Sequence, residues 1–277
     1  MKYAILMPNF GAGGDASFLV DLAREAEGAG WDAFFLWDHL QWPGIEPCVD
    51  PWVALGAMAV VMQRIRVGTM VTPVPRRDIA KLARETISVD RLSGGRLILG
   101  IGLGWHTIPE WSGFGHETEL KTRGAMLNEA LEVLFALWSG EAVDHSGRFY
   151  EVHCDGFGPP LQKPRISVWA GATWPSVRPL RRAAMLDGVM PIAKNASQGQ
   201  RLTPEDVGEI RTLMTGHTNL PQDYAFAIGD ATQGPNDTEM PRSFASAGVN
   251  WWVESCRSLL QEPDKLVERV KCGPARI

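Results

Sequence analysis

Two adjacent polar residues, Asp38 and His39, directly follow the apolar segment FFLW at residues 34–37. A histidine exchanges protons near neutral pH, and a carboxylate beside it can accept hydrogen bonds from a heterocyclic ligand. Asp38 could also cap the following turn, with His39 only bordering a loop. The pair alone favours this simpler structural role. Further segments with the same organisation make a reactive site the better interpretation.

Two of these segments combine an apolar run with glycines and charge. In GTMVTPVPRRD, residues 68–78, a glycine and two prolines permit irregular backbone, and Arg76 and Arg77 follow. In GIGLGW, residues 100–105, the glycines would let a planar ligand approach the main chain, although a tight turn would also explain them. This is not a dinucleotide-binding motif, because the third glycine of G-x-G-x-x-G is replaced by Trp105.

A third segment, WAGATWPS at residues 169–176, comes directly before an expected helix. Gly171, Ala172 and Thr173 can offer main-chain N–H groups and a hydroxyl to an anion, to which a helix N-terminus adds positive potential. Arg178 could bind the same anion or belong to a solvated helix face. Indole rings at the expected strand ends could stack on a ligand or fill space, namely those of Trp37, Trp42, Trp105, Trp169 and Trp174.

The elements that position these segments alternate along the chain. Short apolar runs predict strands at 3–7, 33–37, 65–72, 96–101, 165–170, 188–192, 225–228 and 250–253. Helical spacing of apolar residues predicts helices at 17–27, 52–62, 79–92, 125–138, 177–186, 203–214 and 263–270. This order is typical of a closed (β/α)8 TIM barrel, whose strands finish at one shared rim.

Residues 141–164 interrupt the alternation with glycines and prolines. We expect an inserted excursion between strands four and five, such as a hairpin, over one barrel end. There is no long repeat or low-complexity linker, so residues 1–277 are predicted to form a single domain.

Composition excludes several classes of function. Hydrophobic residues make up 45% and charged residues 21%, as in ordinary globular domains, and the net charge of -5 provides no basic surface for nucleic acid or anionic membrane. No apolar run approaches the ~20 residues of a membrane span. Four scattered cysteines without a C-x-x-C pair predict free thiols in a reducing cytoplasm. The six histidines form no metal-ligand spacing, so no metal site is expected.

The chain resembles the bacterial luciferase-like monooxygenase family, the flavin- and deazaflavin-dependent oxidoreductases built on a TIM barrel. The resemblance extends over nearly the whole chain, through YAILMPNFG, WDHL, PLRRAAMLDGVMP and NWWVES, and is most specific at residues 64–105. It implies a ring cofactor across the mouth of the barrel, where the carboxyl ends of the strands lie, with its phosphate near residues 171–173. It also implies a cis peptide between Met70 and Val71, in a bulge that supports the ring.

The resemblance assigns roles to individual residues. His39 and Asp38 match the pair that contacts the cofactor and manages protons in deazaflavin-using relatives, which makes both candidate catalytic residues. Trp42 and Trp105 are expected to line the pocket of a small-molecule substrate. The expected cofactor-binding residues are Asp38, Met70, Val71, Thr72, Gly102, Leu103, Gly104, Gly171, Ala172, Thr173 and Arg178.

Coenzyme F420 is the preferred cofactor, with FMN as the alternative, because the Asp-His pair after the second strand and the arginines after the third and fifth strands suit this cofactor and its long anionic tail. Trp105 stands where sugar-phosphate-oxidising relatives carry glutamate, which argues against glucose 6-phosphate as substrate. A non-catalytic flavin-binding protein of the same fold and a metal-dependent barrel hydrolase stay open as other interpretations. The short connection between residues 228 and 250 could leave the mouth open or let a neighbouring subunit close it, as in a homodimer.

Overall fold

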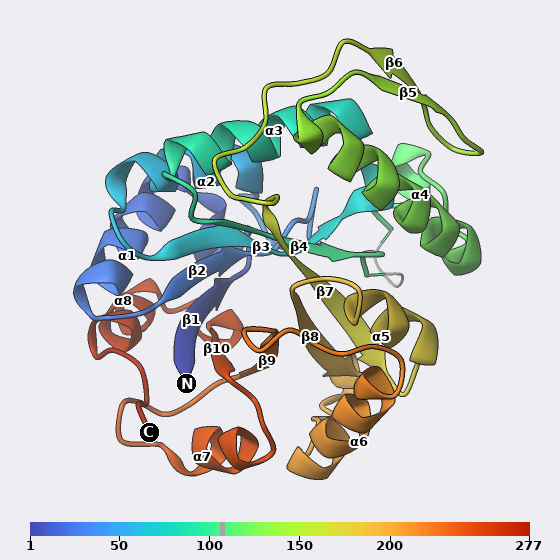
Figure 1. The fold of residues 1–277 in the computed structure, drawn as a ribbon. Helices are drawn as coiled ribbons and strands as arrows, with labels where there is room; N and C mark the ends of the chain where they lie inside the picture. Colours follow the sequence, from blue (N-terminus) through green and yellow to red (C-terminus); the bar gives the residue numbers. More distant parts are fainter. Residues whose placement is uncertain (106–108) are drawn as a thin grey trace.

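The computed structural model describes residues 1–105 and 109–277. Eight parallel strands close into a barrel in which β1 lies between β2 and β10 (Figure 1). Around the barrel they are β1 (Lys2–Met7), β10 (Trp251–Ser255), β9 (Ala225–Asp230), β8 (Gly188–Ala193), β7 (Ser167–Trp174), β4 (Leu97–Gly102), β3 (Arg66–Pro73) and β2 (Ala33–Leu36). The predicted TIM barrel is confirmed.

Helices surround the barrel on its outside (Figure 1). They are α1 (Ala16–Gly28), α2 (Pro51–Val61), α3 (Ile79–Leu92), α4 (Leu120–Ser139), α5 (Val177–Ala183), α6 (Pro204–Thr215), α7 (Glu239–Ser246) and α8 (Pro263–Lys271). The side chains of Asp50 and Asp78 cap α2 and α3 by accepting main-chain N–H groups of the first turn. Among the helices described, none combines the length and apolar character that a bilayer crossing requires.

Alternation of side chains along each strand separates two apolar layers. Outward residues such as Tyr3 and Ile5 pack toward the helices. Trp37 and Val71 lie partly buried on the inner layer, so they form its boundary at the mouth. The inner layer fills the barrel and consists of Ala4, Leu6, Ala33, Phe35, Met70, Ile98, Trp169, Met190, Ala225, Ala227, Trp251 and Val253.

Strand β3 is irregular near its carboxyl end. Its register with β4 shifts between Thr69 and Thr72. The peptide bond between Met70 and Val71 is cis, which confirms the prediction. A Cβ atom at Gly100 of β4 would lie 2.1 Å from the carbonyl oxygen of Thr69. Only glycine therefore fits beside this bulge.

The excursion between β4 and β7 contains an antiparallel hairpin of β5 (Val143–Ser146) and β6 (Glu151–Cys154). Glu129 of α4 binds the hairpin turn, because its carboxylate accepts the N–H groups of Phe149 at 2.9 Å and Tyr150 at 2.8 Å. Figure 1 shows the hairpin outside the ring of helices, beside α4. The insertion is as predicted, but its expected place over a barrel end was wrong.

Several element boundaries differ from the prediction. β7 continues to Trp174, well past the expected end at residue 170, and α5 ends earlier, at Ala183. The helix α7 was not predicted at all. Its buried residues are Pro241 and Phe244, which are too few to produce a helical repeat in the sequence.

Candidate active site at the barrel mouth

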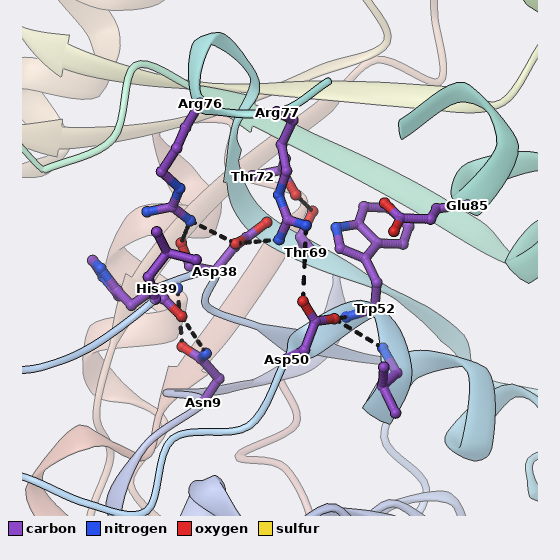
Figure 2. Close-up of polar contacts among 12 residues, drawn as sticks. Asn9, Asp38, His39, Asp50, Trp52, Thr69, Thr72, Arg76, Arg77 and Glu85 are labelled. Carbon is purple, nitrogen blue, oxygen red and sulfur yellow. Dashed lines mark hydrogen bonds and ion pairs between the residues drawn. The ribbon is translucent and has the colours of Figure 1, made fainter. Parts of the chain in front are cut away.

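His39 lies just past the carboxyl end of β2, and Asn9 fixes its main chain there (Figure 2). The fully buried Asn9 side chain accepts a hydrogen bond from the His39 N–H at 3.1 Å and donates one to the His39 carbonyl at 2.8 Å. It donates another to the Val49 carbonyl at 2.7 Å. Asn9 follows β1, so the ends of two neighbouring strands position His39.

Asp38 is 2% exposed and binds two arginines that follow β3. Its Oδ1 accepts hydrogen bonds from Nη2 of Arg76 at 2.8 Å and from Nη2 of Arg77 at 2.6 Å. Arg76 also donates to the Asp38 carbonyl at 2.7 Å. Figure 2 shows both guanidinium groups converging on Asp38. The second oxygen, Oδ2, is buried and has no hydrogen-bond partner among the described residues.

The arrangement of Arg76 and Arg77 corrects one expectation. Both were expected as cations at the rim that suit an anionic cofactor tail, but their side chains are only 1% and 16% exposed. Arg77 also approaches Asp50, with 3.8 Å between Nη1 and Oδ2. Buried carboxylates require counter-charges, which explains why these arginines pair with protein groups. They support the site and are not free to attract a ligand.

A buried glutamate, Glu110, completes the network. Its Oε1 lies 3.0 Å from Nδ1 of His39 and accepts a hydrogen bond from Nη1 of Arg76 at 2.6 Å. Its Oε2 accepts the N–H of Leu40 at 2.9 Å, and the residue is 0% exposed. Sequence reasoning missed Glu110, because no strand or helical repeat surrounds it. Asn9 was also missed, although it follows the first strand much as Asp38 and His39 follow the second.

The charges of this network set the protonation of neighbouring groups. Burial would raise the pKa of Glu110, but the hydrogen bond with His39 and the charge of Arg76 outweigh it, so the pKa lies below its ordinary value. Burial, with Glu46 and Glu110 nearby, raises the pKa of the Cys48 thiol to about 11. Burial and Arg76 lower the pKa of His116. Glu110 is therefore a carboxylate at neutral pH, and Cys48 is a protonated thiol.

The side chain of Val71 joins the glycine segments of β4 and β7. A Cβ atom at Gly102 would lie 2.5 Å from Cγ2 of Val71, and one at Gly171 would lie 3.0 Å from Cγ1. The structure thus brings three predicted cofactor residues together, and glycine at two of them makes room for the third. Met70 is 3% exposed and Thr72 is fully buried, which leaves Val71 as the partly exposed side chain of the bulge.

Residues 171–173 belong to β7. This corrects the expectation that the strand ends at residue 170 and that these residues lie between it and the helix. Pairing of β7 with β8 continues to Trp174 opposite Ala193, whereas pairing with β4 ends at Ala170. Among the described residues, the main chain beyond Ala170 therefore has a sheet partner on one side only. This open side is where a ligand could meet main-chain N–H groups.

The side chains of this segment differ in accessibility. Gly171 and Thr173 are partly exposed, whereas Ala172 is 3% exposed and contributes only its main chain. Arg178, in the first turn of α5, is exposed and makes no ion pair within the described part of the chain. Its positive charge is thus available at this side of the mouth.

Trp111 anchors the segment that follows β4. A Cβ atom at Gly104, where φ is +75°, would lie 2.4 Å from the indole ring. Nε1 of Trp111 donates to the Trp105 carbonyl at 3.2 Å, and the guanidinium of Arg123 lies 4.0 Å from the ring centroid. Arg123 also donates to the Leu103 carbonyl at 3.0 Å. The predicted cofactor residues Leu103 and Gly104 therefore have protein partners that explain their conformation.

An aromatic cluster surrounds His39. Phe10 stacks on Trp42 with 4.6 Å between ring centroids, and the His39 ring meets Trp42 edge-on at 5.2 Å. Trp37 lies 5.9 Å from Trp42, and Arg257 lies over Trp42 at 5.5 Å. The predicted substrate residue Trp42 is therefore next to the candidate catalytic histidine. In the described residues, no three His, Cys, Asp or Glu side chains are grouped as a metal site would need.

The family model of the luciferase-like monooxygenases matches residues 1–210. The chain therefore belongs to the luciferase-like monooxygenase family. An uncharacterized protein of Mycobacterium tuberculosis is 36% identical over 124 residues, which cover 45% of this chain and 43% of that protein. The F420-dependent glucose-6-phosphate dehydrogenase of Amycolatopsis mediterranei is 31% identical over 210 residues, 68% of this chain and 62% of that enzyme. These matches span less than two thirds of each relative.

Solved structures of other proteins share the fold of this luciferase-like chain. An F420-dependent secondary alcohol dehydrogenase, in complex with an F420-acetone adduct, superimposes with a TM-score of 0.76 at 14% identity and covers 100% of this chain and 99% of its own. A monooxygenase from Streptomyces bottropensis gives a TM-score of 0.74 at 18% identity, covering 98% and 97%. At these identities the comparison shows the barrel architecture alone.

Proposed function

We propose that the protein is an oxidoreductase that uses coenzyme F420, or FMN in its place, for hydride transfer or monooxygenation of a small organic substrate. One observation carries the proposal. At the mouth of the barrel, Asp38 and His39 are held by hydrogen bonds with Asn9, Arg76 and Glu110, at the end of the strand that pairs with the irregular strand β3. A preorganised proton-exchanging group beside a ring-binding surface is what such chemistry requires of the protein.

The residues at the mouth fit a flavin-like ring. The buried Oδ2 of Asp38 has no partner among the described residues, and an unsatisfied buried acceptor suits a ring N–H donor. Gly171 and Thr173 leave accessible main chain toward β4, where a phosphate could accept N–H groups. Bound there, the cofactor would supply hydride or oxygen chemistry. His39 would exchange the proton, and the indoles of Trp37 and Trp42 would exclude water.

The grounds for preferring coenzyme F420 change in part, because the Asp38-His39 pair remains while two of the arginines do not. Arg76 and Arg77 are paired with carboxylates, so among the predicted basic residues Arg178 is left to attract an anionic tail. The F420-dependent dehydrogenases among the relatives support the deazaflavin. Trp105, at the position where sugar-phosphate-oxidising relatives carry glutamate, continues to argue against glucose 6-phosphate as substrate.

Titration of the purified protein with coenzyme F420 and with FMN in the same buffer tests the cofactor. The absorbance and fluorescence of the cofactor report its binding, and we expect F420 to bind more tightly than FMN. We also expect Gly171→Val to weaken the binding of F420. Tighter binding of FMN would reverse the order of cofactors. Binding of neither would contradict the proposed function. Tight binding without turnover of any electrophile or alcohol would favour the flavin-binding protein.

His39→Ala is the first test of the catalytic role. We expect turnover to fall by ~10²-fold, because proton transfer by a positioned side chain contributes about that much. Cofactor affinity and the unfolding midpoint should change little, since the His39 main-chain contacts with Asn9 remain. Steady-state kinetics of cofactor oxidation or reduction measure the effect. Unchanged turnover would remove His39 from the mechanism.

The domain organisation, the location in the cell and the oligomeric state are proposed on separate grounds. We propose that residues 1–277 work as one domain, because the described residues build one closed barrel. Four free thiols suit the cytoplasm, where disulfides are rare. A homodimer through α2 is proposed because this helix carries no charged residue and exposes Val53 at 67% and Val60 at 59%.

A further inference from the structure

The ring of His39 has one protein hydrogen bond among the described residues, and Glu110 makes it. The distance between Oε1 of Glu110 and Nδ1 of His39 is 3.0 Å. No described residue bonds the other ring nitrogen, Nε2. The side chains are 11% exposed for His39 and 0% exposed for Glu110. The imidazole is therefore held from the protein side at one nitrogen, and the other nitrogen is left for a reactant.

The chemistry of a carboxylate decides which nitrogen carries the proton in neutral His39. An ionised carboxylate only accepts hydrogen bonds, so Nδ1 must be the N–H donor toward Glu110. Nε2 then has a free lone pair and is the atom that can take up a proton. A carboxylate that orients an imidazole in this way also stabilises the positive charge that forms on it.

We propose that Glu110 is a positioning residue for His39, which fixes its tautomer and makes Nε2 the nitrogen that exchanges protons with the substrate or cofactor. This inference rests on the proposed function, because it assigns Glu110 a role through His39. Glu110 lies in the segment after β4 and is not part of the Asp38-His39 pair that follows β2. The inference also predicts that the effect of Glu110 depends entirely on His39.

The position of Glu110 is itself fixed from three sides. Nη1 of Arg76 and the N–H of Leu40 donate to its two oxygens at 2.6 Å and 2.9 Å. The adjacent Trp111 packs on Gly104 and lies beneath Arg123, so the segment cannot shift without breaking that contact. Arg76 bridges Glu110 to Asp38, which couples both carboxylates of the site through one guanidinium.

The charged and titratable groups around His39 come from several elements. Asp38 precedes it, Arg76 and Arg77 follow β3, and Glu110 and His116 lie in the segment after β4. Cys48 donates to the His39 carbonyl and stays protonated at neutral pH. Asp38 and Glu110 are balanced by the two arginines. Removing the charge of Glu110 would therefore leave a net positive charge beside the imidazole.

The test compares Glu110→Gln with a matched control, Glu254→Gln. Glu254 is also a buried glutamate paired with an arginine, since it is 2% exposed and its Oε2 lies 3.3 Å from Nη2 of Arg269. Its hydrogen bonds among the described residues are with Thr232 and Trp252 and do not include His39. Both variants replace one buried carboxyl group beside an arginine by a neutral amide of nearly the same shape. We expect only Glu110→Gln to lower turnover, by about 10-fold or more, with unchanged cofactor affinity and an altered pH profile of turnover.

Nitrogen-15 NMR of labelled histidine reads the tautomer without any substrate. We expect His39 to be protonated at Nδ1 in the neutral wild type, and to populate both tautomers in Glu110→Gln. Glu254→Gln should leave the His39 signals unchanged. A neutral wild-type His39 protonated at Nε2 would overturn the proposal, whatever the enzyme assay gives.

A double-mutant cycle separates failure of this inference from failure of the proposed function. In the His39→Ala background, Glu110→Gln should cause no further loss of turnover, because its effect passes through the imidazole. Additive losses would mean that Glu110 acts independently, and the inference would be wrong while His39 keeps its role. If His39→Ala itself leaves turnover unchanged, the proposed function of His39 fails first.

Discussion

At the scale of single residues, the site consists of charges that have been removed from water. Asp38, Arg76 and Glu110 have side chains at most 1% exposed, so each is stable only with its partners present. Removing one member of a buried pair leaves its partner uncompensated, which costs far more than breaking a pair in solvent. This network therefore couples the stability of the protein to the geometry of the mouth.

Asp38→Asn should lower the free energy of unfolding by about 3 kcal/mol, because Arg76 and Arg77 lose the charge that they share. Asp21→Asn is the control. Asp21 pairs with Arg24 on the surface, where the two side chains are 73% and 56% exposed, and the loss should be below about 1 kcal/mol. Urea denaturation at neutral pH measures both. Equal losses in the two variants would contradict the importance of burial.

Glu110 and Glu254 should affect stability with opposite dependence on pH. The pKa of Glu110 is lowered, so its carboxylate stabilises the fold above the ordinary value of 4.5, and this contribution is lost as the pH falls through the lowered pKa. Burial raises the pKa of Glu254 above 4.5 despite Arg269, so its contribution is present in acid and is lost as the pH rises through the raised pKa.

The measurement is the difference in unfolding free energy between wild type and each Gln variant, from urea curves between roughly pH 2.5 and pH 8, a range that includes carboxylates with lowered and with raised pKa values. We expect the stabilising difference for Glu110 to grow with pH and that for Glu254 to shrink. Parallel curves for the two variants would show that their environments do not differ as described.

How far the sequence predicts this site also depends on single residues. Asp38 and His39 were identifiable because they directly follow a buried strand, and all strand ends of a parallel barrel meet at one rim. Glu110 was not, because its contact with His39 is made across a segment without repeating pattern. The arginines after β3 were identified, but their partners were not, since ion pairs between separate loops leave no spacing in the sequence.

At the scale of elements, glycines determine how β3, β4 and β7 fit together. Gly100 lies against the Thr69 carbonyl of the bulge, and Gly102 and Gly171 lie against Val71. The sequence suggested that such glycines admit a ligand to the main chain. The structure shows that these glycines allow β3 to approach β4 and β7 closely. The strand pattern itself was predicted well, because apolar runs between turns are the strongest signal that a barrel leaves in its sequence.

Gly100→Ala should destabilise the protein by about 3 kcal/mol, because the new methyl group would lie 2.1 Å from a backbone oxygen that cannot move alone. Gly56→Ala is the matched control. Gly56 lies inside α2, and no atom of the described residues lies within 4 Å of the added carbon, so the change should stabilise by ~0.5–1 kcal/mol. Thermal and urea unfolding measure both changes. A neutral Gly100→Ala would mean that the bulge can relax.

The elements that escaped prediction have a common physical cause. α7 buries only Pro241 and Phe244, and β7 runs on into residues whose composition resembles a turn. In both cases long-range packing determines the conformation, and local composition does not. The pairing of residues 171–174 with β8 illustrates this, since no pattern in either segment indicates that the two segments pair.

At the scale of the whole molecule, the exposed apolar face of α2 predicts self-association. Replacing Val53 and Val60 with Lys should convert the proposed dimer into a monomer of 30.4 kDa, because charges would be buried at the contact. Met185→Lys is the control, since Met185 is 75% exposed but lies after α5. Sedimentation velocity measures the mass. A wild-type monomer would exclude the dimer, and a dimer unaffected by the α2 changes would place its interface elsewhere.

The closure of the barrel between β1 and β10 also matters while the chain is being synthesised. β10 occupies the place between β1 and β9, so the sheet has two open edges until residues 251–255 have left the ribosome. During that interval the nascent chain presents unpaired strand edges to other nascent chains and to chaperones. A slow or stalled translation of the last strand would therefore prolong the period in which this protein can aggregate.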